Sequence, residues 1–599
     1  MKNCELLFED FNERKKSMTI FNVLELICGL ALFLYGMDVM GEYLKKSAGS
    51  SLKTILGKMT SSPFKGFILG LGVTAIIQSS SATTVMVVGF VNSGTMTLLQ
   101  SVGVIMGANV GTAVTSWLTG LSGAGDALKW LKPDAWMPIL AAAGIILVMF
   151  AKRGKKKDIG YILLGFAVLM VGMDIMSGSV AGLKEDASFK EILLQFQNPI
   201  LGVLAGLVLT VIVQSSSASI GILQSLTATG AITFGAAIPI IMGQNIGTCI
   251  TAILSSISAN KNGKRAALIH LYFNVIGMVV WLTVYSIVQA LTPAIQEFAA
   301  GTIDMWGVAI VHTTFKVLTV LLIAPFYKLL EKLAVLTIKD TAEDEEDKSS
   351  PLDERLLITP AVAVERATEV TGAMAIVSAK ALRNALSVFE QYDPKLAEKV
   401  RKQEAKADNY EDSLGSYLIK ISENAVDEQD SKQITKLLHI IGDFERISDH
   451  AVNIVESAEE IIDKKIVFSE EATNELGVLR SAVLEILDLT EEAFIENNIE
   501  KAKMVEPLEQ VIDGLKNKIK RHHIRRLQNN ECTIENGFVL ADILNNLERV
   551  SDHCSNIAEC VIEISERELL DTHKYMKEIK SEDSGFEQKY REYKGKYSI

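Results

Sequence analysis

Two groups of hydroxyl and amide side chains stand in otherwise apolar sequence, and such groups can bind ions. The segment Gln78 to Ser81 reads QSSS and recurs as Gln214 to Ser217. We call the difference between these positions, 214 − 78 = 136, the repeat offset. Hydroxyl and amide oxygens can ligate a hard cation, while backbone N–H groups at the start of a half-helix can face an anion. The residue types therefore indicate a site for a small anion together with cations.

The repeat offset relates further motifs, so the apolar part of the chain contains an internal duplication. The sequence GMD at residues 36–38 recurs at 172–174, and NxGT at 109–112 recurs at 245–248. A single polar motif would favour helix packing, because Ser and Thr commonly bond to helix backbones inside membranes. Two copies in register favour ligand binding, in a transporter whose site lies where the repeats meet.

Positive side chains are missing around both QSSS motifs. No Lys or Arg lies between residues 66 and 128 or between residues 191 and 260. We therefore expect that a bound anion is neutralised by co-bound cations rather than by a fixed positive side chain. This pattern predicts cation-coupled symport of a small, oxygen-rich anion.

The elements that must position these motifs are short apolar helices. A spanning helix needs roughly 20 apolar residues, whereas residues 64–77 and 200–213, which precede the two motifs, form shorter runs. Short apolar pieces around a polar break predict re-entrant hairpins whose tips are buried in protein. Basic residues at 45–65 predict a cytoplasmic approach to the first hairpin, but the equivalent approach at 178–198 carries two Lys against three acidic residues and does not favour the cytoplasm. We therefore expect two inverted repeats.

Charge divides the 599-residue chain into two parts. Residues 1–340 contain 25 Lys and Arg against 18 Asp and Glu, and the remaining residues contain 34 against 54. An acidic stretch between them ends at Pro351, which is typical of a linker. We predict an all-α protein with an N-terminal extension (1–19), membrane repeats (20–155 and 156–292), a final transmembrane helix (293–338), an acidic linker (339–357), a helical soluble domain (358–570) and a charged tail (571–599).

Taken together, the motifs of the apolar part resemble the sodium–phosphate cotransporter family, the bacterial relatives of the type II animal transporters. The resemblance covers about residues 20–335 and includes two related segments, HLYFN at 270–274 and HTTFK at 312–316. It implies symport of inorganic phosphate with sodium, by alternating access between the two hairpins. The residues implied in substrate and sodium binding are Gln78, Ser79, Ser80, Ser81, Thr83, Thr84, Asn109, Thr112, Gln214, Ser215, Ser216, Ser217, Ser219, Asn245 and Thr248.

Four Glu-x-x-x-Asp pairs occur in the charged part, two in each of its halves. Carboxylates at i and i+4 share a helix face and repel one another, and a bound cation would relieve that repulsion. A solvated acidic face explains a single pair, whereas four pairs make metal binding an equal alternative. The eight residues are Glu404, Asp408, Glu445, Asp449, Glu509, Asp513, Glu548 and Asp552.

This arrangement resembles PhoU-like domains, which are pairs of three-helix bundles whose E-x-x-x-D motifs can hold metal. The resemblance implies a regulatory domain in the cytoplasm, a divalent cation or iron cluster, and contact with phosphate-signalling proteins. We expect no nucleic-acid partner, because the basic run 516–526 fits one helix face in an acidic domain. We also expect no enzymatic activity, since no nucleophile–base constellation occurs.

Two other functions fit the same residues. One is a phosphate-responsive signalling protein in the membrane that no longer transports, and the other is phosphate export through the same site. We expect a multi-pass protein of the cell membrane whose C-terminal domain is cytoplasmic. The sequence leaves open the direction of transport, the sodium stoichiometry, the metal and the oligomeric state.

Overall fold

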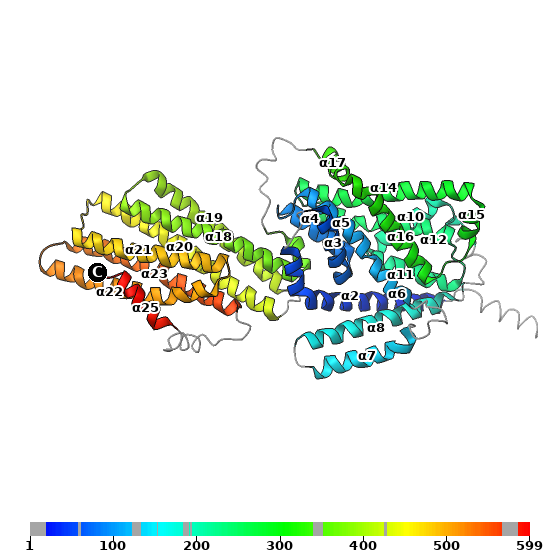
Figure 1. Ribbon diagram of the computed structural model, residues 1–599, viewed down its shortest axis with the longest axis horizontal. Helices are drawn as coiled ribbons and strands as arrows, with labels where there is room; N and C mark the ends of the chain where they lie inside the picture. Colours follow the sequence, from blue (N-terminus) through cyan, green and yellow to red (C-terminus); the bar gives the residue numbers. More distant parts are fainter. Residues whose placement is uncertain are drawn as a thin grey trace, which may run out of the picture. The chain divides into compact units, whose positions relative to one another are not determined.

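The computed structural model describes residues 20–57, 62–121, 133–151, 154–181, 183, 191, 195–339, 352–424, 428–565 and 585–599. These residues are almost entirely helical, and their single β-bridge joins Thr233 to Thr302. Internal contacts divide the chain into a first unit that ends at Ala361 and a second unit that begins at Val362. The all-α prediction is confirmed (Figure 1). Most of the predicted acidic linker, and much of the predicted tail, lie outside the described residues.

Helices of the first unit fall into long and short classes. Within the described residues, six stretches are long and apolar enough to cross a membrane: α2, α5 with α6, α8, α12 with α13, α14, and α16 with α17. The helices α3, α4 and α10 have only 15, 13 and 15 residues. The bounds are α2 Ile20–Gly57, α3 Pro63–Ile77, α4 Ser80–Asn92, α5 Leu98–Gly111, α6 Ala113–Gly120, α7 Pro133–Phe150, α8 Lys155–Val180, α10 Pro199–Val213, α11 Ser216–Leu226, α12 Phe234–Gly247, α13 Cys249–Ser256, α14 Lys261–Leu291, α15 Pro293–Ala300, α16 Met305–Ile323, α17 Tyr327–Thr337 and the 3₁₀ helix η7 Glu354–Ile358.

The two repeats that the sequence indicates pack their helices in the same way. Helix α3 packs on α5, and helix α10 packs on α12. A Cβ atom at Gly107 would lie 1.9 Å from the carbonyl oxygen of Phe67, and one at Gly243 would lie 1.9 Å from the carbonyl oxygen of Val203. Both the glycines and their partners are related by the repeat offset, since 243 − 107 = 203 − 67. The same close approach, which only glycine permits, is therefore built twice.

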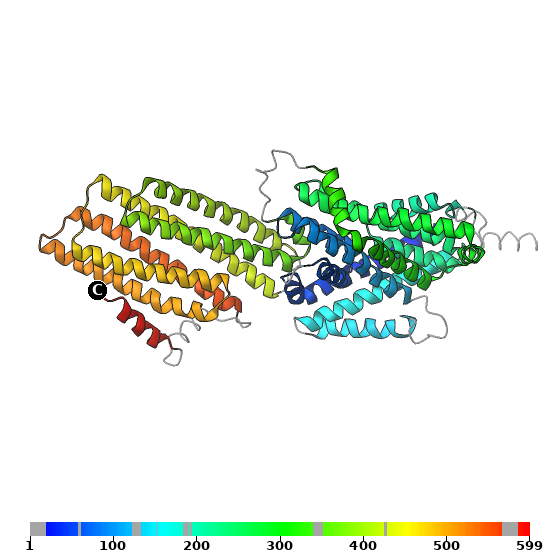
Figure 2. The ribbon, with the colours of Figure 1, turned by 45° about the horizontal axis from the view of Figure 1, so that its top comes forward.

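Helix α2 packs most extensively on α8. A Cβ atom at Gly29 would lie 2.8 Å from the carbonyl oxygen of Gly172, and one at Gly36 would lie 2.5 Å from the carbonyl oxygen of Gly165. The later residue of α2, Gly36, meets the earlier residue of α8, Gly165, and the two helices therefore run antiparallel. Helix α8 also packs on α7, and Figure 2 shows these two helices, in cyan, side by side.

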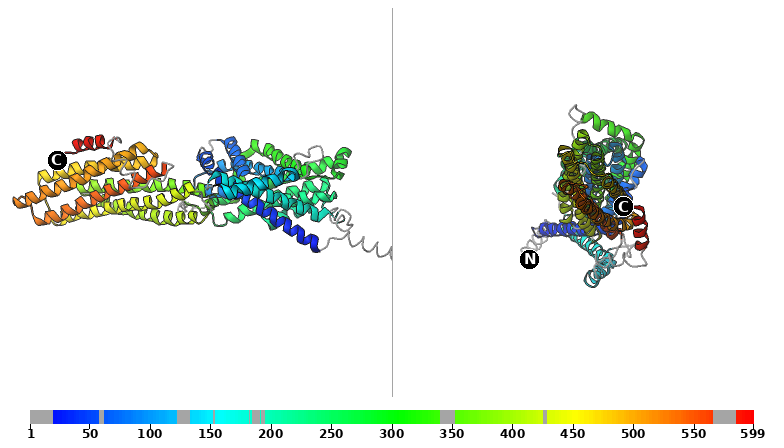
Figure 3. Two further views of the ribbon diagram at one scale, coloured as in Figure 1. Left: turned by 90° about the horizontal axis from the view of Figure 1, so that it is seen from below. Right: turned by 90° about the vertical axis from the view of Figure 1, so that its left-hand side faces the viewer.

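The second unit consists of long amphipathic helices that lie lengthwise beside one another (Figure 3). Helices α21, α22 and α23 pack on each other, α19 packs on α20, and α20 packs on α23. Apolar side chains such as Leu437, Phe444 and Leu547 are buried between them. The bounds are α18 Pro360–Glu390, α19 Pro394–Ser422, α20 Glu428–Asp463, α21 Glu470–Ile495, α22 Ile499–Gln528, α23 Ile534–Ser565 and α25 Phe586–Lys596.

Candidate functional site

Both QSSS segments line one cavity in the first unit. We call residues 78–81 the first tip and residues 214–217 the second tip. The cavity has a volume of about 470 Å³, and all eight tip residues contribute to its wall. The remaining lining residues are Leu34, Met37, Asp38, Gly41, Glu42, Lys45 and Ile77.

Each tip is a sharp break between two helices. Gln78 and Gln214 end α3 and α10 in the left-handed conformation, with φ of 58° and 54°. Ser79 and Ser215 then cap the next helices, and each hydroxyl accepts a hydrogen bond of 3.2 Å from the backbone N–H three residues on. Left-handed backbone in a non-glycine residue costs about 1–3 kcal/mol, and it persists where the surrounding structure holds it.

The helices that leave the two tips begin at the cavity. Ser80 is the first residue of α4 and Ser216 is the first residue of α11, and both side chains belong to the cavity wall. The N-terminus of a helix carries unpaired N–H groups and a partial positive charge, which favour an anion. Serine hydroxyls and glutamine amides beside them can ligate a cation. The arrangement therefore has the chemistry of a shared anion and cation site.

Seven of the fifteen predicted binding residues are not part of the cavity wall. Thr83 and Ser219 are buried and accept hydrogen bonds of 3.0 Å from Thr74 and 2.8 Å from Thr210, so they tie each tip helix to the helix before it. The Thr84 hydroxyl donates to the carbonyl of Ser80 at 2.9 Å. These three residues support the tips.

The other four residues, on α5 and α12 or at their ends, are buried and bond to their own helices. The amides of Asn109 and Asn245 donate to the carbonyls four residues earlier, at 2.9 Å and 2.7 Å. Thr112 and Thr248 donate in the same way, at 3.2 Å and 3.0 Å. Spacing in the sequence did not show that these residues lie outside the cavity wall.

Charged residues that the sequence argument left aside also reach the cavity. Asp38, Glu42 and Lys45 of α2 line it, at spacings of four and three residues that place them on one helix face. Lys45 corrects the expectation that no fixed positive side chain serves this site. The missed signal was this i, i+4, i+7 pattern of charge, which begins at Asp38 of the GMD motif and lies far from the QSSS motifs along the chain.

In the second unit, four predicted metal-binding residues of the first half influence one another. Burial and the nearby carboxylate of Asp449 raise the pKa of Glu445 to about 7. Burial together with Asp449 and Asp408 also raises the pKa of Glu404. Carboxylates of α19 and α20 therefore face each other, and this set fits the oxygen chemistry of a hard or divalent cation.

In the second half, basic side chains accompany the equivalent residues. Lys516 lies 3.0 Å from Glu548 in an ion pair, and Arg549 lies 3.4 Å from Asp552. Asp513 accepts a hydrogen bond of 3.1 Å from Asn517. Because these partners already offset the negative charge, the second set, which includes Glu509, fits a cation less well than the first.

A further acidic cluster was not anticipated. Glu471, Glu475 and His522 bring ligand-type atoms close together. However, Arg526 lies 3.3 Å from Glu471 and 2.8 Å from Glu475. The cluster is accordingly held by an arginine, and it forms an ion-pair network.

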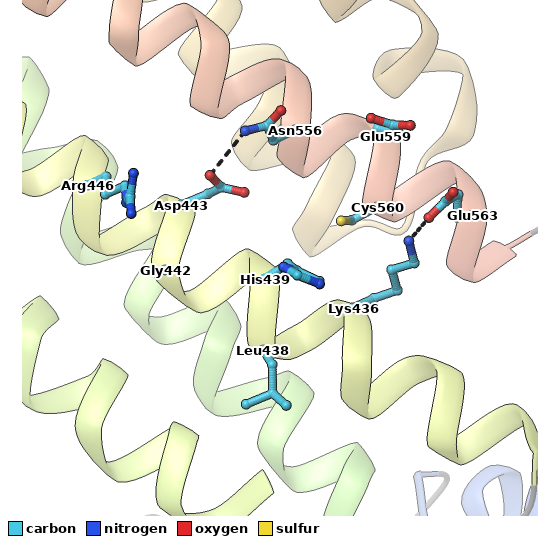
Figure 4. A pocket seen from close by; sticks show the side chains of 10 residues that line it. All are labelled: Lys436, Leu438, His439, Gly442, Asp443, Arg446, Asn556, Glu559, Cys560 and Glu563. Atoms are coloured by element: carbon cyan, nitrogen blue, oxygen red, sulfur yellow. Dashed lines mark hydrogen bonds and ion pairs between the residues drawn. The ribbon is translucent and has the colours of Figure 1, made fainter. Parts of the chain in front are cut away.

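A pocket of about 390 Å³ lies between α20 and α23 (Figure 4). There Asp443 accepts a hydrogen bond from Asn556 at 3.3 Å and pairs with His553 at 2.8 Å. In the equivalent contact, His450 of α20 bonds to Asn546 of α23 at 2.9 Å. His553 lies 103 residues after His450, and Asn546 lies 103 residues after Asp443. The duplication of this unit therefore extends to its side-chain contacts.

Comparison with known proteins gives matches over both units. The family described as Na+/Pi-cotransporter matches residues 32–178 and 181–305, and the family described as PhoU domain matches residues 372–458 and 478–561. YjbB of Salmonella typhimurium, whose name describes inorganic phosphate export, is 24% identical over 552 residues, 91% of this chain and 98% of YjbB. YqeW of Bacillus subtilis is 30% identical over 313 residues, 52% of this chain and 96% of YqeW. Sodium-dependent phosphate transport protein 2A of Ovis aries is 22% identical over 397 residues, 45% of this chain and 62% of that protein.

Proposed function

Since this chain belongs to the Na+/Pi-cotransporter family and carries a PhoU domain, we propose that it moves inorganic phosphate across the cell membrane together with sodium. The observation that carries the proposal is the convergence of both tips on one cavity. The tips offer two helix N-termini for the anion, and serine and glutamine oxygens for sodium. The eight tip residues are proposed as direct ligands. Thr83, Thr84, Ser219, Asn109, Thr112, Asn245 and Thr248 are proposed to hold the tips in place.

Alternating access is proposed to arise from the two related halves. The antiparallel seam of α2 and α8, at Gly29 with Gly172 and Gly36 with Gly165, supports an inverted arrangement. The short lengths of α3, α4 and α10 support re-entrant hairpins, since each is shorter than the roughly 20 residues that a crossing needs. Rocking of one half against the other would open the shared cavity to each side in turn.

Lys45 gives the cavity one fixed positive charge, and Asp38 and Glu42 give it two negative charges. The acidic pair is proposed to attract sodium to the site. Lys45 is proposed to assist entry of the anion, so that phosphate does not depend on sodium alone for neutralisation.

The second unit is proposed to be a cytoplasmic regulatory domain that responds to phosphate status. Glu404, Asp408, Glu445 and Asp449 would hold a divalent cation or iron cluster. Burial and repulsion by Asp449 raise the pKa of Glu445, and the cation would relieve that repulsion. Glu509, Asp513, Glu548 and Asp552 are proposed as a weaker second site because Lys516 already pairs with Glu548.

Export is the second candidate function, because a relative that covers 91% of this chain is named for phosphate export. The test is transport of radiolabelled phosphate by the full chain in proteoliposomes, with sodium, potassium or choline as the cation. Uptake that follows an inward sodium gradient supports symport, and efflux from loaded vesicles without a sodium gradient supports export. No movement under any gradient would contradict both and leave a signalling role.

A further inference from the structure

Among the ionisable side chains that are buried in the described part of the first unit, three lie on α14 and α16, outside the cavity wall. His270 on α14 and His312 on α16 are each 1% exposed, and Lys316 on α16 is 3% exposed. Asn274, also 1% exposed, follows His270 by one helical turn, as Lys316 follows His312. Burying ionisable side chains in apolar helices costs free energy, and such residues in membrane proteins usually have a functional role.

The two polar helix faces meet. A Cβ atom at Gly277 would lie 2.5 Å from Cγ2 of Thr319, so α14 and α16 almost touch there. Gly277 stands three residues after Asn274, and Thr319 stands three residues after Lys316. The Lys316 ammonium is close enough to act electrostatically on both histidine rings. The four side chains therefore form one cluster.

Several polar atoms of this cluster have no hydrogen-bond partner among the described residues. They are both ring nitrogens of His270, Nε2 of His312 and Oδ1 of Asn274. Buried polar atoms are almost always bonded, so atoms left without a partner indicate an absent ligand or water. Here two donor-capable rings and one acceptor are left open at the same place.

Charge narrows the identity of that ligand. Lys316 is 3% exposed, and no carboxylate among the described residues forms an ion pair with it. A buried ammonium without a counter-charge is strongly disfavoured. A small anion would supply the charge, and a protonated oxyanion could also donate its hydroxyl to Oδ1 of Asn274.

We propose that Lys316, His270, His312 and Asn274 form an inner anion site that binds inorganic phosphate. The site is separate from the cavity between the tips, and its assignment to phosphate rests on the proposed function. Phosphate oxygens accept hydrogen bonds from the ammonium and the imidazole N–H groups, and a phosphate hydroxyl donates to Asn274. Lys316 stands in for one sodium ion, so this site binds phosphate without sodium.

Hydrogen bonds connect the inner site to the first tip. Nδ1 of His312 bonds to the Ser116 hydroxyl at 3.2 Å, and the adjacent Thr115 donates to Oε1 of Gln78 at 2.9 Å. Asn274 donates to Oδ1 of Asn109 at 3.2 Å, and Asn109 lies on the helix that packs against α3. These contacts link the inner site to the first tip through α5 and α6.

The test is equilibrium binding of radiolabelled phosphate to the purified full chain in choline buffer free of sodium. Wild type should bind, and Lys316→Met should lower the affinity at least tenfold. Lys316→Arg should restore part of the affinity, which separates loss of charge from loss of folding. Lys332→Met, which removes an exposed lysine on α17, is the matched control and should bind like wild type.

Competition by sulfate checks the role of Asn274. Sulfate carries no hydroxyl at neutral pH, so it should compete poorly in wild type and better in Asn274→Leu. Unchanged sodium-free binding in Lys316→Met would overturn the inner site. If wild type still shows sodium-driven uptake in that case, the proposed function stands. If wild type shows neither binding nor uptake of phosphate, both proposals fail.

Discussion

The hydroxyl of Thr115 on α6 donates a hydrogen bond of 2.9 Å to the side-chain oxygen of Gln78. The equivalent residue of the second half, one repeat offset further along the chain, is Thr251. It donates instead to the carbonyl of Thr248 in its own helix at 3.0 Å. The first tip therefore has a support that comes from outside its own helices, and at this position the two halves differ.

Removing this support should weaken binding at the first tip. Thr115→Val keeps the side-chain volume but leaves the buried oxygen of Gln78 without its donor. A lost buried hydrogen bond costs about 1–3 kcal/mol, so we expect a loss of roughly ten-fold in phosphate affinity. Thr251→Val is the matched control and should transport within about two-fold of wild type. Equal effects of both variants would show that the Thr115 bond has no special role.

Replacing a serine that lines the cavity should lower phosphate affinity more than replacing a serine that does not line it. Ser80→Ala and Ser216→Ala each remove one oxygen from the cavity wall and should lower phosphate affinity ten- to a hundred-fold, since hydrogen bonds to ions are worth about 1.5–3 kcal/mol. Ser101 is fully buried and bonds to the carbonyl of Leu98, so Ser101→Ala should bind nearly as well as wild type. Uptake at sub-saturating phosphate and sodium measures all three. Equal uptake by the three variants would mean that the tip serines serve in packing and do not bind ions.

Inverted repeats predict that equivalent positions lie on opposite sides of the membrane. Ser62 caps α3 and Asn198 caps α10, and the two positions are related by the repeat offset. Cysteines introduced at each position, in a variant without native cysteines, should react with an impermeant thiol reagent from opposite sides of oriented vesicles. Labelling of both from the same side would exclude the inverted arrangement.

Metal binding in the second unit should depend chiefly on its first half. Residues 362–599, expressed alone, should retain a metal after dialysis, as measured by elemental analysis. Asp449→Ala should remove most of it and Asp552→Ala a smaller part, because Lys516 already pairs with the neighbouring Glu548. A wild-type fragment that stays free of metal after incubation with iron, manganese or zinc would leave only a solvated acidic face.

The raised pKa of Glu445 predicts the direction of a pH effect. In the fold this carboxyl has a pKa of about 7, against an ordinary value of about 4.3 in the unfolded chain. The folded state holds the proton more tightly, so the added stability is complete below the ordinary pKa and is lost as pH rises through about 7. In a metal-free buffer with chelator, the denaturation midpoint of fragment 362–599 should decrease as the pH is raised from about 5 to about 8. Glu445→Gln should flatten this dependence, and an unchanged slope would contradict the assignment.

Much of the fold was accessible from the sequence because the duplication leaves a constant offset. The repeat offset predicted that both QSSS segments serve one site, and the structure places both tips on one cavity. The breaks at the tips were also predictable, since a polar run between short apolar segments cannot continue a spanning helix.

The contributions of α2 and α6 to the site could not be predicted in the same way. Lys45 and Thr115 reach the tips through tertiary packing, and nothing in their local sequence indicates which distant segment they contact. The supporting role of Thr83 was hidden for the same reason, because spacing places it beside the tip but does not show that Thr74 bonds to it.

The glycine seam between α2 and α8 also records how this chain arose. Subtracting the repeat offset from the α8 residues turns Gly172 into position 36 and Gly165 into position 29. In an unfused single copy, Gly29 would thus meet Gly36 of a second copy, and Gly36 would meet Gly29 in return. That reciprocity defines an isologous contact between identical subunits. The seam therefore has the self-complementary form of a homodimer interface, built here within one polypeptide.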